Sequence, residues 1–404
     1  MKIIHTSDWH LGQRFFDRDR FDEHEAFLGF LLETIETHAV DLLIVAGDIF
    51  DTANPPREAE RIYYQFLTKL SAMGGCSAII VGGNHDSAPH LDAPATVLEA
   101  LRVQVVGSLP DEVADAVFYV QSLRDEDDPG VWVAAMPYLR DRDVRKAVAG
   151  ESFDDMEART KAGVVAAYEK IAEALKAKDP RAPLIATGHL TALGGSISHS
   201  DSERTIHIGN LGSISGAQFP ECFDYVALGH LHRAQKVSKN GHIRYSGSPL
   251  PLSFSEAGGT KEIRIIDTAA GNLTHEALAV PSFRRLIRLK GNAEALKDRL
   301  TDLKVDETEM TPWLELVVEG SLPSTTLNEE LRGLADEHGA EVLKVGLDSR
   351  GRTSTDLDLS GLTISELKPE EVFKRRLEAY DGDVPADTLG HCFAHLLTQA
   401  QEAE

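Results

Sequence analysis

Polar side chains of the kinds that bind metal ions follow five short apolar stretches of this sequence. The densest group is Asn84-His85-Asp86, which comes directly after an apolar stretch and the glycine pair Gly82-Gly83. An amide, an imidazole and a carboxylate in a row are poor building blocks for a core, because each buried polar group needs a partner. They suit a metal ligand, a proton donor and its orienting carboxylate. The other four groups are Asp8-Trp9-His10, Gly47-Asp48, Gly188-His189 and Gly229-His230-Leu231-His232.

The stretches before these groups have the composition of buried strands. They are short, continuous and apolar, and a glycine at four of the five ends allows a sharp turn or a close backbone approach. They cover Lys2–Thr6, Asp41–Ala46, Ser77–Val81, Pro183–Thr187 and Asp224–Leu228. Helical periodicity over 22–37 and 57–71 separates the first three, which predicts parallel strands joined by crossover helices. Ligands of such sheets gather beyond the carboxyl ends of the strands, so all five groups are expected at one site.

The donor set at these strand ends is typical of a two-metal centre. It offers two aspartates, one asparagine and four or five histidines. A mixture of imidazole, carboxylate and amide suits Mn, Fe or Zn better than Ca or Mg. Seven donor groups with one shared carboxylate are enough for two ions. Two metals roughly 3.5–4 Å apart clamp the attacking and leaving oxygens of a phosphoryl displacement and activate a water, so no Ser or Cys nucleophile is required.

Each group taken alone also has a structural explanation. Asp48 can accept backbone N–H bonds in a turn, His189 can be a buried histidine with a hydrogen-bond partner, and His230 with His232 can hold a single metal. Asn84-His85-Asp86 is the hardest to explain in this way. A non-enzymatic alternative is a scaffold subunit whose metal site is structural or has lapsed. The intact set of donors from Asp8 to His232 argues against it.

Composition indicates a folded, acidic, multidomain protein. The 404 residues exceed one ordinary core, so two or three domains are expected. The net charge of -24 argues against simple electrostatic binding to nucleic acid, unless a local basic face or bound cations reverse the sign. The three cysteines are far apart and predict no disulfide framework. The polar start of the chain and the lack of a long apolar run predict a cytoplasmic protein with no signal peptide and no membrane contact.

The sequence pattern changes near Pro281. From there a strand, helix, strand, helix and strand follow one another, which predicts a small α+β unit. A polar stretch without periodicity then predicts a linker, and two helices over 369–380 and 389–400 close the chain. The predicted domains are a catalytic domain over 1–281, a capping domain over 282–347, a linker over 348–367 and a helical segment over 368–404.

The five groups together resemble the motif series of the calcineurin-like metallophosphoesterases. Three longer stretches are more specific and resemble the SbcD-type nuclease subunits within that superfamily. They are Asp48-Ile-Phe-Asp51-Thr, Ala227-Leu-Gly-His230-x-His232-Arg-Ala-Gln and Tyr245-Ser-Gly-Ser-Pro249-x-Pro251-Leu-Ser-Phe254. The resemblance covers essentially the whole chain. It implies an α/β fold with a metallophosphoesterase β-sandwich flanked by helices, a small α+β capping domain and a C-terminal helix pair.

The resemblance also implies a role for each site residue. One metal would be held by Asp8, His10, Asp48 and His232, and the second by Asp48, Asn84, His189 and His230, with Asp48 bridging. His85 would face the scissile phosphate while Asp86 orients its ring, so both are assigned to catalysis. The cofactors would be two divalent ions, with Mn²⁺ expected. Archaeal and eukaryotic relatives have a second histidine where this chain has Asp51, and the role of Asp51 stays open.

The implied activity is that of a DNA nuclease subunit of an ATP-driven complex in DNA repair, recombination and replication. It would combine 3′-to-5′ exonuclease action on duplex ends with endonuclease action on single strands and hairpins. The chain has no phosphate-loop motif, so ATP hydrolysis would belong to an SbcC-type ATPase partner with a coiled coil. The terminal helices would dock onto that partner, in a homodimer within a heterotetramer associated with the nucleoid.

The enzymatic alternative is a general metallophosphoesterase acting on nucleotides or phosphoproteins, and the capping domain and the terminal helices favour the nuclease over it.

Some of the basic residues near the motifs are expected to contact the DNA backbone. The candidates are Arg14, Arg18, Arg20, Arg284, Arg285, Arg288 and Lys290, with Arg233 favoured because it directly follows His232.

Overall fold

The computed structural model describes most of the chain up to residue 347. It covers residues 1–146, 148, 150–176, 178, 181–193, 213–237, 239, 241–268, 273–306, 310–320 and 325–347, and the isolated residues Leu389 and Phe393. Residues 1–346 form one compact unit. The predicted linker and terminal helix pair lie outside the described residues, apart from Leu389 and Phe393, which are both helical.

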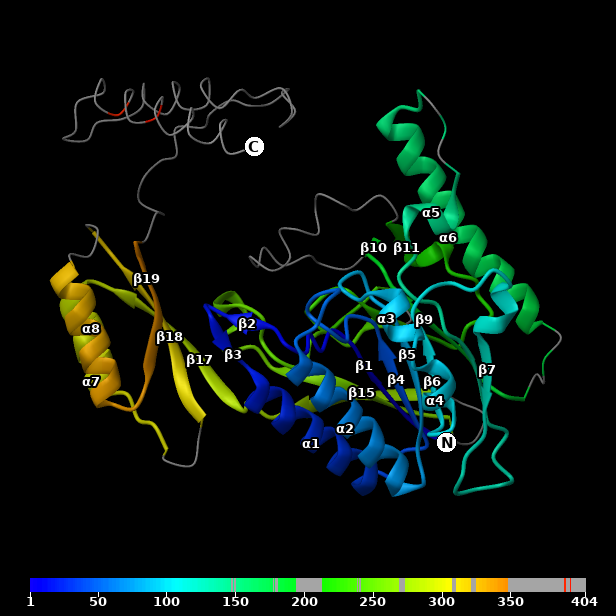
Figure 1. Cartoon of the computed structure of the whole chain (residues 1–404), viewed down its shortest axis with the longest axis horizontal. Coiled ribbons are helices and arrows are strands. Elements are labelled where there is room, and N and C mark those ends of the chain that lie inside the picture. Colours follow the sequence, from blue (N-terminus) through cyan, green and yellow to red (C-terminus); the bar gives the residue numbers. More distant parts are fainter. Residues whose placement is uncertain are drawn as a thin grey trace. The chain divides into compact units, whose positions relative to one another are not determined.

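Two six-stranded sheets form the main body (Figure 1). The first has the order β16-β15-β1-β4-β5-β6, with four parallel strands and an antiparallel pair at one edge. Its strands are β1 (Lys2–Thr6), β4 (Leu42–Ala46), β5 (Ser77–Val81), β6 (Val103–Val106), β15 (Lys261–Asp267) and β16 (Thr274–Val280). The second sheet has the order β13-β14-β12-β9-β8-β7, with parallel inner strands. Its strands are β7 (Val117–Val120), β8 (Val131–Ala134), β9 (Leu184–His189), β12 (Tyr225–Gly229), β13 (Gln235–Lys236) and β14 (Ile243–Tyr245).

The two sheets face each other across a buried apolar core. Side chains on one face of β1, β4 and β5 form a single buried cluster with side chains of β8, β9 and β12, including Ile3, Ile44, Ile79, Val133, Ile185 and Ala227. Period-two alternation places the neighbouring residues on the outer faces of the sheets. Helices α1 (Phe21–Thr37) and α2 (Arg57–Met73) cover the outer face of the first sheet, and α6 (Phe153–Leu175) covers that of the second. The predicted β-sandwich flanked by helices is therefore confirmed.

Shorter elements complete this body. The helices α3 (Ala88–Asp92), α4 (Ala95–Glu99) and α5 (Asp141–Val144) lie in the connections between strands. A two-stranded ribbon consists of β10 (Ala192–Leu193) and β11 (Ile214–Ser215). A tight hairpin consists of β2 (Arg14–Phe15) and β3 (Arg18–Asp19), and it begins four residues after His10.

A smaller, three-stranded sheet begins at Arg284. It has the order β17-β18-β19, from β17 (Arg284–Gly291), β18 (Met310–Val318) and β19 (Glu341–Leu347). Helices α7 (Ala293–Thr301) and α8 (Thr325–Glu337) pack on it around a core of its own that includes Leu296, Leu314 and Leu331. The predicted order of strands and helices after residue 281 is found. A separate apolar cluster of Phe15, Phe254, Leu286 and Trp313 joins this sheet to the larger body.

A buried ion triad also joins the small sheet to the larger body. Glu23 on α1 is 1% exposed and binds Arg20, also 1% exposed, through two hydrogen bonds of 3.1 and 2.6 Å. The same carboxylate accepts a 3.1 Å bond from Nε of Arg284, the first residue of β17. Arg284 also lies over the ring of Trp313. Arg20 and Arg284 are both held by Glu23, and their expected contacts with DNA stay a prediction.

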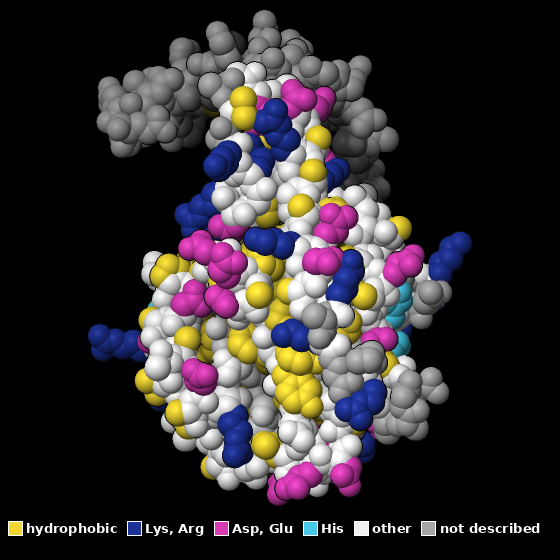
Figure 2. Space-filling model, turned by 90° about the vertical axis from the view of Figure 1, so that its right-hand side faces the viewer, with side chains coloured by type: hydrophobic (Ala, Val, Ile, Leu, Met, Phe, Trp, Pro, Cys, Tyr) yellow, Lys and Arg dark blue, Asp and Glu magenta, His cyan; other side chains and the backbone are white. Residues whose placement is uncertain are grey.

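The remaining surface carries both signs of charge. On the face drawn in Figure 2, acidic and basic side chains are interspersed, and no field of one sign covers it. Several predicted DNA-binding cations have acidic neighbours: Arg14 pairs with Asp19, Arg18 with Glu341 and Arg288 with Glu315. Among the helices of the described residues, none is long and apolar enough to cross a lipid bilayer.

We predict that Glu23→Gln lowers the stability of the whole unit. Removing the carboxylate leaves the buried Arg20 and Arg284 without their counter-charge, which costs about 3–5 kcal/mol in comparable buried pairs. The matched control is Glu25→Gln on the same helix, because Glu25 forms an exposed pair with Arg61 that solvent screens and that contributes little to stability. Urea unfolding of the two variants measures the difference. Equal midpoints would show that the triad does not hold the small sheet in place.

Candidate metal centre

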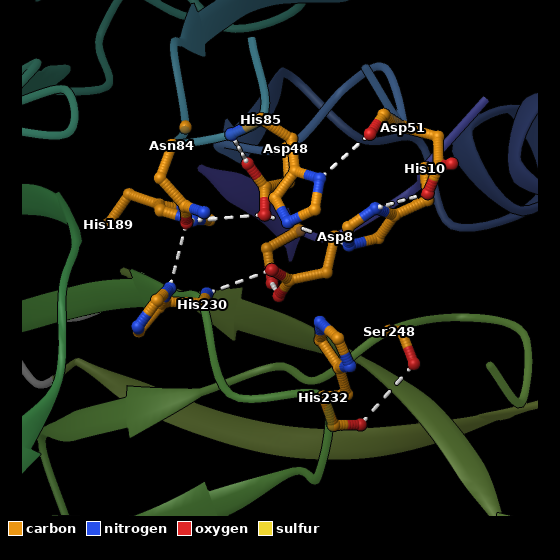
Figure 3. A network of polar contacts seen from close by, with 12 residues as sticks. Asp8, His10, Asp48, Asp51, Asn84, His85, His189, His230, His232 and Ser248 are labelled. Atoms are coloured by element: carbon orange, nitrogen blue, oxygen red, sulfur yellow. Dashed lines mark hydrogen bonds and ion pairs between the residues drawn. The ribbon is translucent and has the colours of Figure 1, made fainter. Parts of the chain in front are cut away.

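The five predicted groups meet at one rim of the sandwich. Asp8, Asp48 and Asn84 follow the neighbouring strands β1, β4 and β5 of the first sheet, whereas His189 ends β9 and His230 follows β12 in the second. The carboxyl ends of both sets of strands face the same space (Figure 3). The sandwich therefore brings together donors separated by more than 200 residues, as the backbone bond from His230 to the Asp8 carboxylate shows (2.8 Å).

One cluster of donors surrounds the Asn84 side chain. Its Oδ1 atom lies 2.9 Å from Nε2 of His189 and 2.9 Å from Nδ1 of His230. Oδ2 of Asp48 lies 3.2 Å from the same His189 nitrogen. Nδ1 of His189 donates to the backbone carbonyl of Ala46 (2.9 Å), which holds the ring and turns Nε2 toward the other donors. These four side chains are the set expected for one of the two metals.

A second cluster lies beside it and contains Asp8, His10 and His232. Their donor atoms lie within 4.8 Å of one another, and all three side chains are buried. Nε2 of His10 and Nδ1 of His232 are buried without a hydrogen-bond partner. A buried polar atom left without a partner costs free energy, so these two nitrogens fit a site that a cation completes. Nε2 of His10 is 3.7 Å from Oδ2 of Asp48, which places Asp48 between the two clusters.

The backbone at the site is held in an unusual conformation. Asp8, His10, Asp48 and His230 all have positive φ angles, between 46° and 98°. Such angles are uncommon outside glycine and persist only where the surroundings enforce them. Gly83 permits the close approach of β5 to this backbone, because a Cβ atom there would collide with the Asp48 carboxylate. The strain is consistent with side chains aimed at a common point.

Burial and the charges of neighbouring aspartates and histidines shift the pKa values at the site. Burial raises the pKa of Asp8, and the charge of Asp48 adds to the effect. Although burial opposes charge on Asp48, the neighbouring His189 and His10 hold its pKa well below the usual value. Burial works against charge on His189 too, but Asp48 raises its pKa to about 9. Without metal, the positive charge that Asp48 requires therefore comes from protons on histidine, and divalent cations would supply the same charge.

His85 and Asp86 have different positions at this site. His85 is exposed, and its ring lies 4.9 Å from that of His10. The expectation that Asp86 orients this ring is wrong. The buried Asp86 carboxylate accepts bonds from the backbone N–H groups of Ile49, Phe50 and Gly83. It ties the loop after β4 to the loop after β5, while burial and the Asp48 charge raise its pKa to about 6.

Asp51 fills the orienting role that Asp86 was expected to have. Its backbone carbonyl accepts a 2.7 Å bond from Nδ1 of His85, and its Oδ1 atom lies 3.2 Å from Nδ1 of His10. With Nδ1 bound in this way, each ring keeps Nε2 for a ligand. The position was visible in the sequence as the aspartate three residues after Asp48. Its role was not, because that role depends on contact with two residues from other strands.

Serine side chains support the same rim. The Ser7 hydroxyl donates to Asp8 and lies 2.8 Å from that of Ser246. The Ser248 hydroxyl and the Lys261 ammonium both contact the carbonyl of His232. Ser246 and Ser248 come from the Tyr-Ser-Gly-Ser-Pro stretch, whose resemblance to known nuclease subunits was the only sequence signal for them.

Asp51→Ala is predicted to weaken metal binding about 10- to 100-fold, the usual effect of removing a partner that orients a ligand. The reason is that the His10 ring loses the acceptor that fixes its tautomer. Titration of the metal-free protein with Mn²⁺ by calorimetry measures the affinity. Thr52→Ala is the matched control, because Thr52 is the next residue and its hydroxyl contacts only the exposed Asn54 carbonyl. Unchanged Mn²⁺ affinity in Asp51→Ala would exclude this role.

Comparison with known proteins agrees with the geometry of the site. The family model of calcineurin-like phosphoesterases matches residues 1–234, and the model of the type 5 capsule protein repressor C-terminal domain matches residues 282–380. The SbcD subunit of the nuclease SbcCD from Escherichia coli K12 is 37% identical over the whole length of both chains. The SbcD subunit from Rhodobacter capsulatus is 39% identical over 67% of each chain, and that from Bacillus subtilis is 28% identical over the whole length of both.

The first model covers every predicted metal ligand from Asp8 to His232, and the second begins two residues before β17. Enzymes of the first family use divalent metal ions, which fits the donor clusters of this rim. The chain belongs to the calcineurin-like phosphoesterases and, within them, to the family of the SbcD subunits of SbcCD nucleases, as its motifs indicated.

Proposed function

We propose that this chain is a metal-dependent DNA nuclease that hydrolyses phosphodiester bonds with a metal-activated water. The observation that carries the proposal is the convergence of the predicted donors on one rim, with His85 exposed beside them. The names of full-length relatives support a nuclease rather than a general phosphoesterase.

In this proposal the two donor clusters hold two divalent ions. Asp8, His10, Asp48 and His232 would bind one, and Asp48, Asn84, His189 and His230 the other, with Asp48 shared. The bound ions would offset the negative charge of the phosphate. They would also lower the pKa of a bound water, so that a hydroxide nucleophile is available near neutral pH. The donor chemistry and the unpartnered nitrogens of His10 and His232 fit this assignment. Mn²⁺ is the proposed ion, because a mixed nitrogen and oxygen donor set suits it better than Ca²⁺ or Mg²⁺.

His85 is proposed to act on the scissile phosphate. Its Nδ1–H is bound to the Asp51 carbonyl, so Nε2 is the atom left to contact the phosphate or to protonate the leaving oxygen. Its exposure allows a polymer to reach it, whereas the histidines of the donor clusters are buried. Asp86 would act one step further away, because it fixes the loops that carry Asp48 and His85.

A polar cavity beside His232 supports a strand of DNA as the substrate. It has a volume of about 660 Å³, and its lining includes the cations Arg233 and Lys261 and the carboxylates Glu256 and Glu262. Arg233 is exposed and remains the favoured contact to a phosphate. Metal ions at the rim would supply the positive charge that offsets the acidic net charge of the chain there.

The remaining details of the proposal concern substrates and assembly. We propose 3′-to-5′ exonuclease action on duplex ends and endonuclease action on single strands and hairpins. The chain would work in the cytoplasm, near the nucleoid, as a homodimer bound to an SbcC-type ATPase in a heterotetramer. The relatives' names, which refer to a subunit of a nuclease complex, support an ATPase partner.

His85→Ala is predicted to lower the rate of DNA cleavage about 10²- to 10⁴-fold, the range for loss of a general acid or base. The assay uses linear duplex and closed single-stranded DNA in Mn²⁺, and metal content is measured in parallel. His90→Ala is the control, because His90 pairs with Glu60 and belongs to none of the donor clusters among the described residues. A wild-type protein inactive on both DNAs even with the ATPase, yet fast on a small phosphodiester, would favour the general phosphoesterase.

Deleting residues 368–404 is predicted to abolish copurification with the ATPase partner. The apolar residues of the two predicted helices are the proposed contacts: Val372, Phe373, Leu377, Phe393, Leu396 and Leu397. Mn²⁺ binding should persist, because every proposed ligand lies before residue 233. Survival of the complex after the deletion would show that the partner binds elsewhere.

A further inference from the structure

Phe16, at the tip of the β2–β3 hairpin, combines a strained backbone conformation with an exposed aromatic ring. Phe16 and Asp17 form the two-residue turn, with φ angles of 46° and 64°. Asparagine and glycine are the usual residues in such a turn, and a phenylalanine there is strained. Phe16 is also 46% exposed, so burial recovers little of the cost. Strain of this kind at an exposed position is typical of a binding site.

The Phe16 ring extends a firmly held aromatic cluster. Its centroid is 5.2 Å from that of Phe15 and 5.5 Å from that of Phe254. Phe15 is buried and lies almost parallel to Trp313 of the small sheet, with 9° between the ring planes. The cluster therefore spans the hairpin, the segment before β15 and β18. A ring held by such neighbours offers a stacking surface with little loss of conformational freedom.

Basic side chains surround the exposed edge of this cluster. A cavity of about 280 Å³ is lined by Phe15, Phe16 and Phe254 together with Arg14, Arg288 and Lys344. The Lys344 ammonium lies 5.7 Å from the centre of the Phe16 ring. The acidic group in the lining is Glu315, whose carboxylate binds both Arg288 (2.7 Å) and Lys344 (2.9 Å). The lining therefore contains three cations and one carboxylate, and Arg14 pairs in addition with Asp19 of the hairpin.

This cavity adjoins the metal centre. Ser255 lines both it and the larger cavity beside His232 and Arg233. The hairpin itself begins four residues after His10. Because the two cavities share Ser255, a strand bound at the metal centre and passing Arg233 would reach Phe16 by way of Ser255.

We propose that Phe16 and the basic residues around it form a subsite for one unpaired nucleotide of the DNA substrate, with its base stacked on Phe16. The proposal rests on the nuclease function proposed above. Stacking on an aromatic side chain combined with Lys and Arg contacts to phosphate is the general way in which proteins hold single strands. The subsite favours an unpaired base, because a base inside a duplex already has its faces stacked. It commits this surface to DNA rather than to a protein partner.

The test measures binding of single-stranded DNA to the full-length protein in Mn²⁺. A phosphorothioate oligonucleotide resists cleavage, and a series of such strands carries one abasic site at each position in turn. Wild type should bind one member of the series clearly more weakly than the others. Phe16→Ala should bind the intact strand roughly 5- to 150-fold more weakly, the range for one stacked base. It should also lose its sensitivity to that abasic position, since both changes remove the same contact.

Matched variants separate stacking from general effects of substitution. Phe16→Trp should retain both the affinity and the abasic sensitivity, whereas Phe16→Leu, which is apolar without a π face, should lose them. Phe153→Ala is the control, because Phe153 is 64% exposed at the start of α6, far along the chain from the hairpin. Arg288→Gln should reduce the salt dependence of binding by about one phosphate contact.

Two outcomes would overturn the subsite. One is a Phe16→Ala protein that binds and discriminates the strands as Phe153→Ala does. The other is unchanged DNA binding by Phe16→Ala together with loss of a protein partner, which would make this surface a protein contact. Cleavage of unprotected DNA by the wild type, assayed alongside, distinguishes these results from failure of the nuclease function itself. A wild type that stays inactive even with the ATPase partner added would refute that function, whereas an active wild type with unaffected Phe16 variants would refute the subsite alone.

Discussion

The buried carboxylate of Asp48 lies between the two sheets and depends on partners that both sheets supply. Its ion-pair partners in the described part of the chain are two histidines, His10 and His189, which come from different sheets. Burying such a charge is costly unless partners surround it. The partners must be held in place by both halves of the sandwich, so the closure of the two sheets and the formation of the site are one event. The strained backbone at Asp8, His10, Asp48 and His230 is the local cost of that arrangement.

The small sheet is coupled to the same region by charge and by aromatic packing. The segment after His10 continues into the hairpin and then to Arg20, which shares Glu23 with Arg284 of the small sheet. Phe15 on that hairpin stacks on Trp313. The first metal-binding motif therefore leads directly into the contacts that orient the small sheet. A substrate touching both would meet one rigid surface, which is the requirement for holding a flexible strand beside a reactive centre.

The group that orients a histidine at this site is its neighbour in space rather than its neighbour in the sequence. Asp86 is adjacent to His85 in the chain, yet its carboxylate faces inward and binds three backbone N–H groups. Asp51 is 34 residues away from His85 and accepts its Nδ1 proton. Adjacent side chains after a strand point in different directions, so Asp86 is poorly placed to orient the His85 ring. The ion pairs of Arg20 and Arg284 with Glu23 likewise cannot be seen from local sequence.

Local sequence patterns were sufficient to predict the strands, their parallel order and the donor groups at their ends. Such patterns are apolar runs followed by Asp, Asn or His. Because the carboxyl ends of parallel strands meet at one edge, these groups were expected to lie together. The order of elements in the small sheet was also predictable, because periodicity and helix breakers act over a few residues. Packing of the sheets was needed to show which donors lie close together, that Asp51 orients His10 and His85, and that Phe16 stands beside basic residues of another sheet. Those relations join residues roughly 30 to 330 positions apart, and their energies depend on distances that arise only when the two sheets and the small unit pack together.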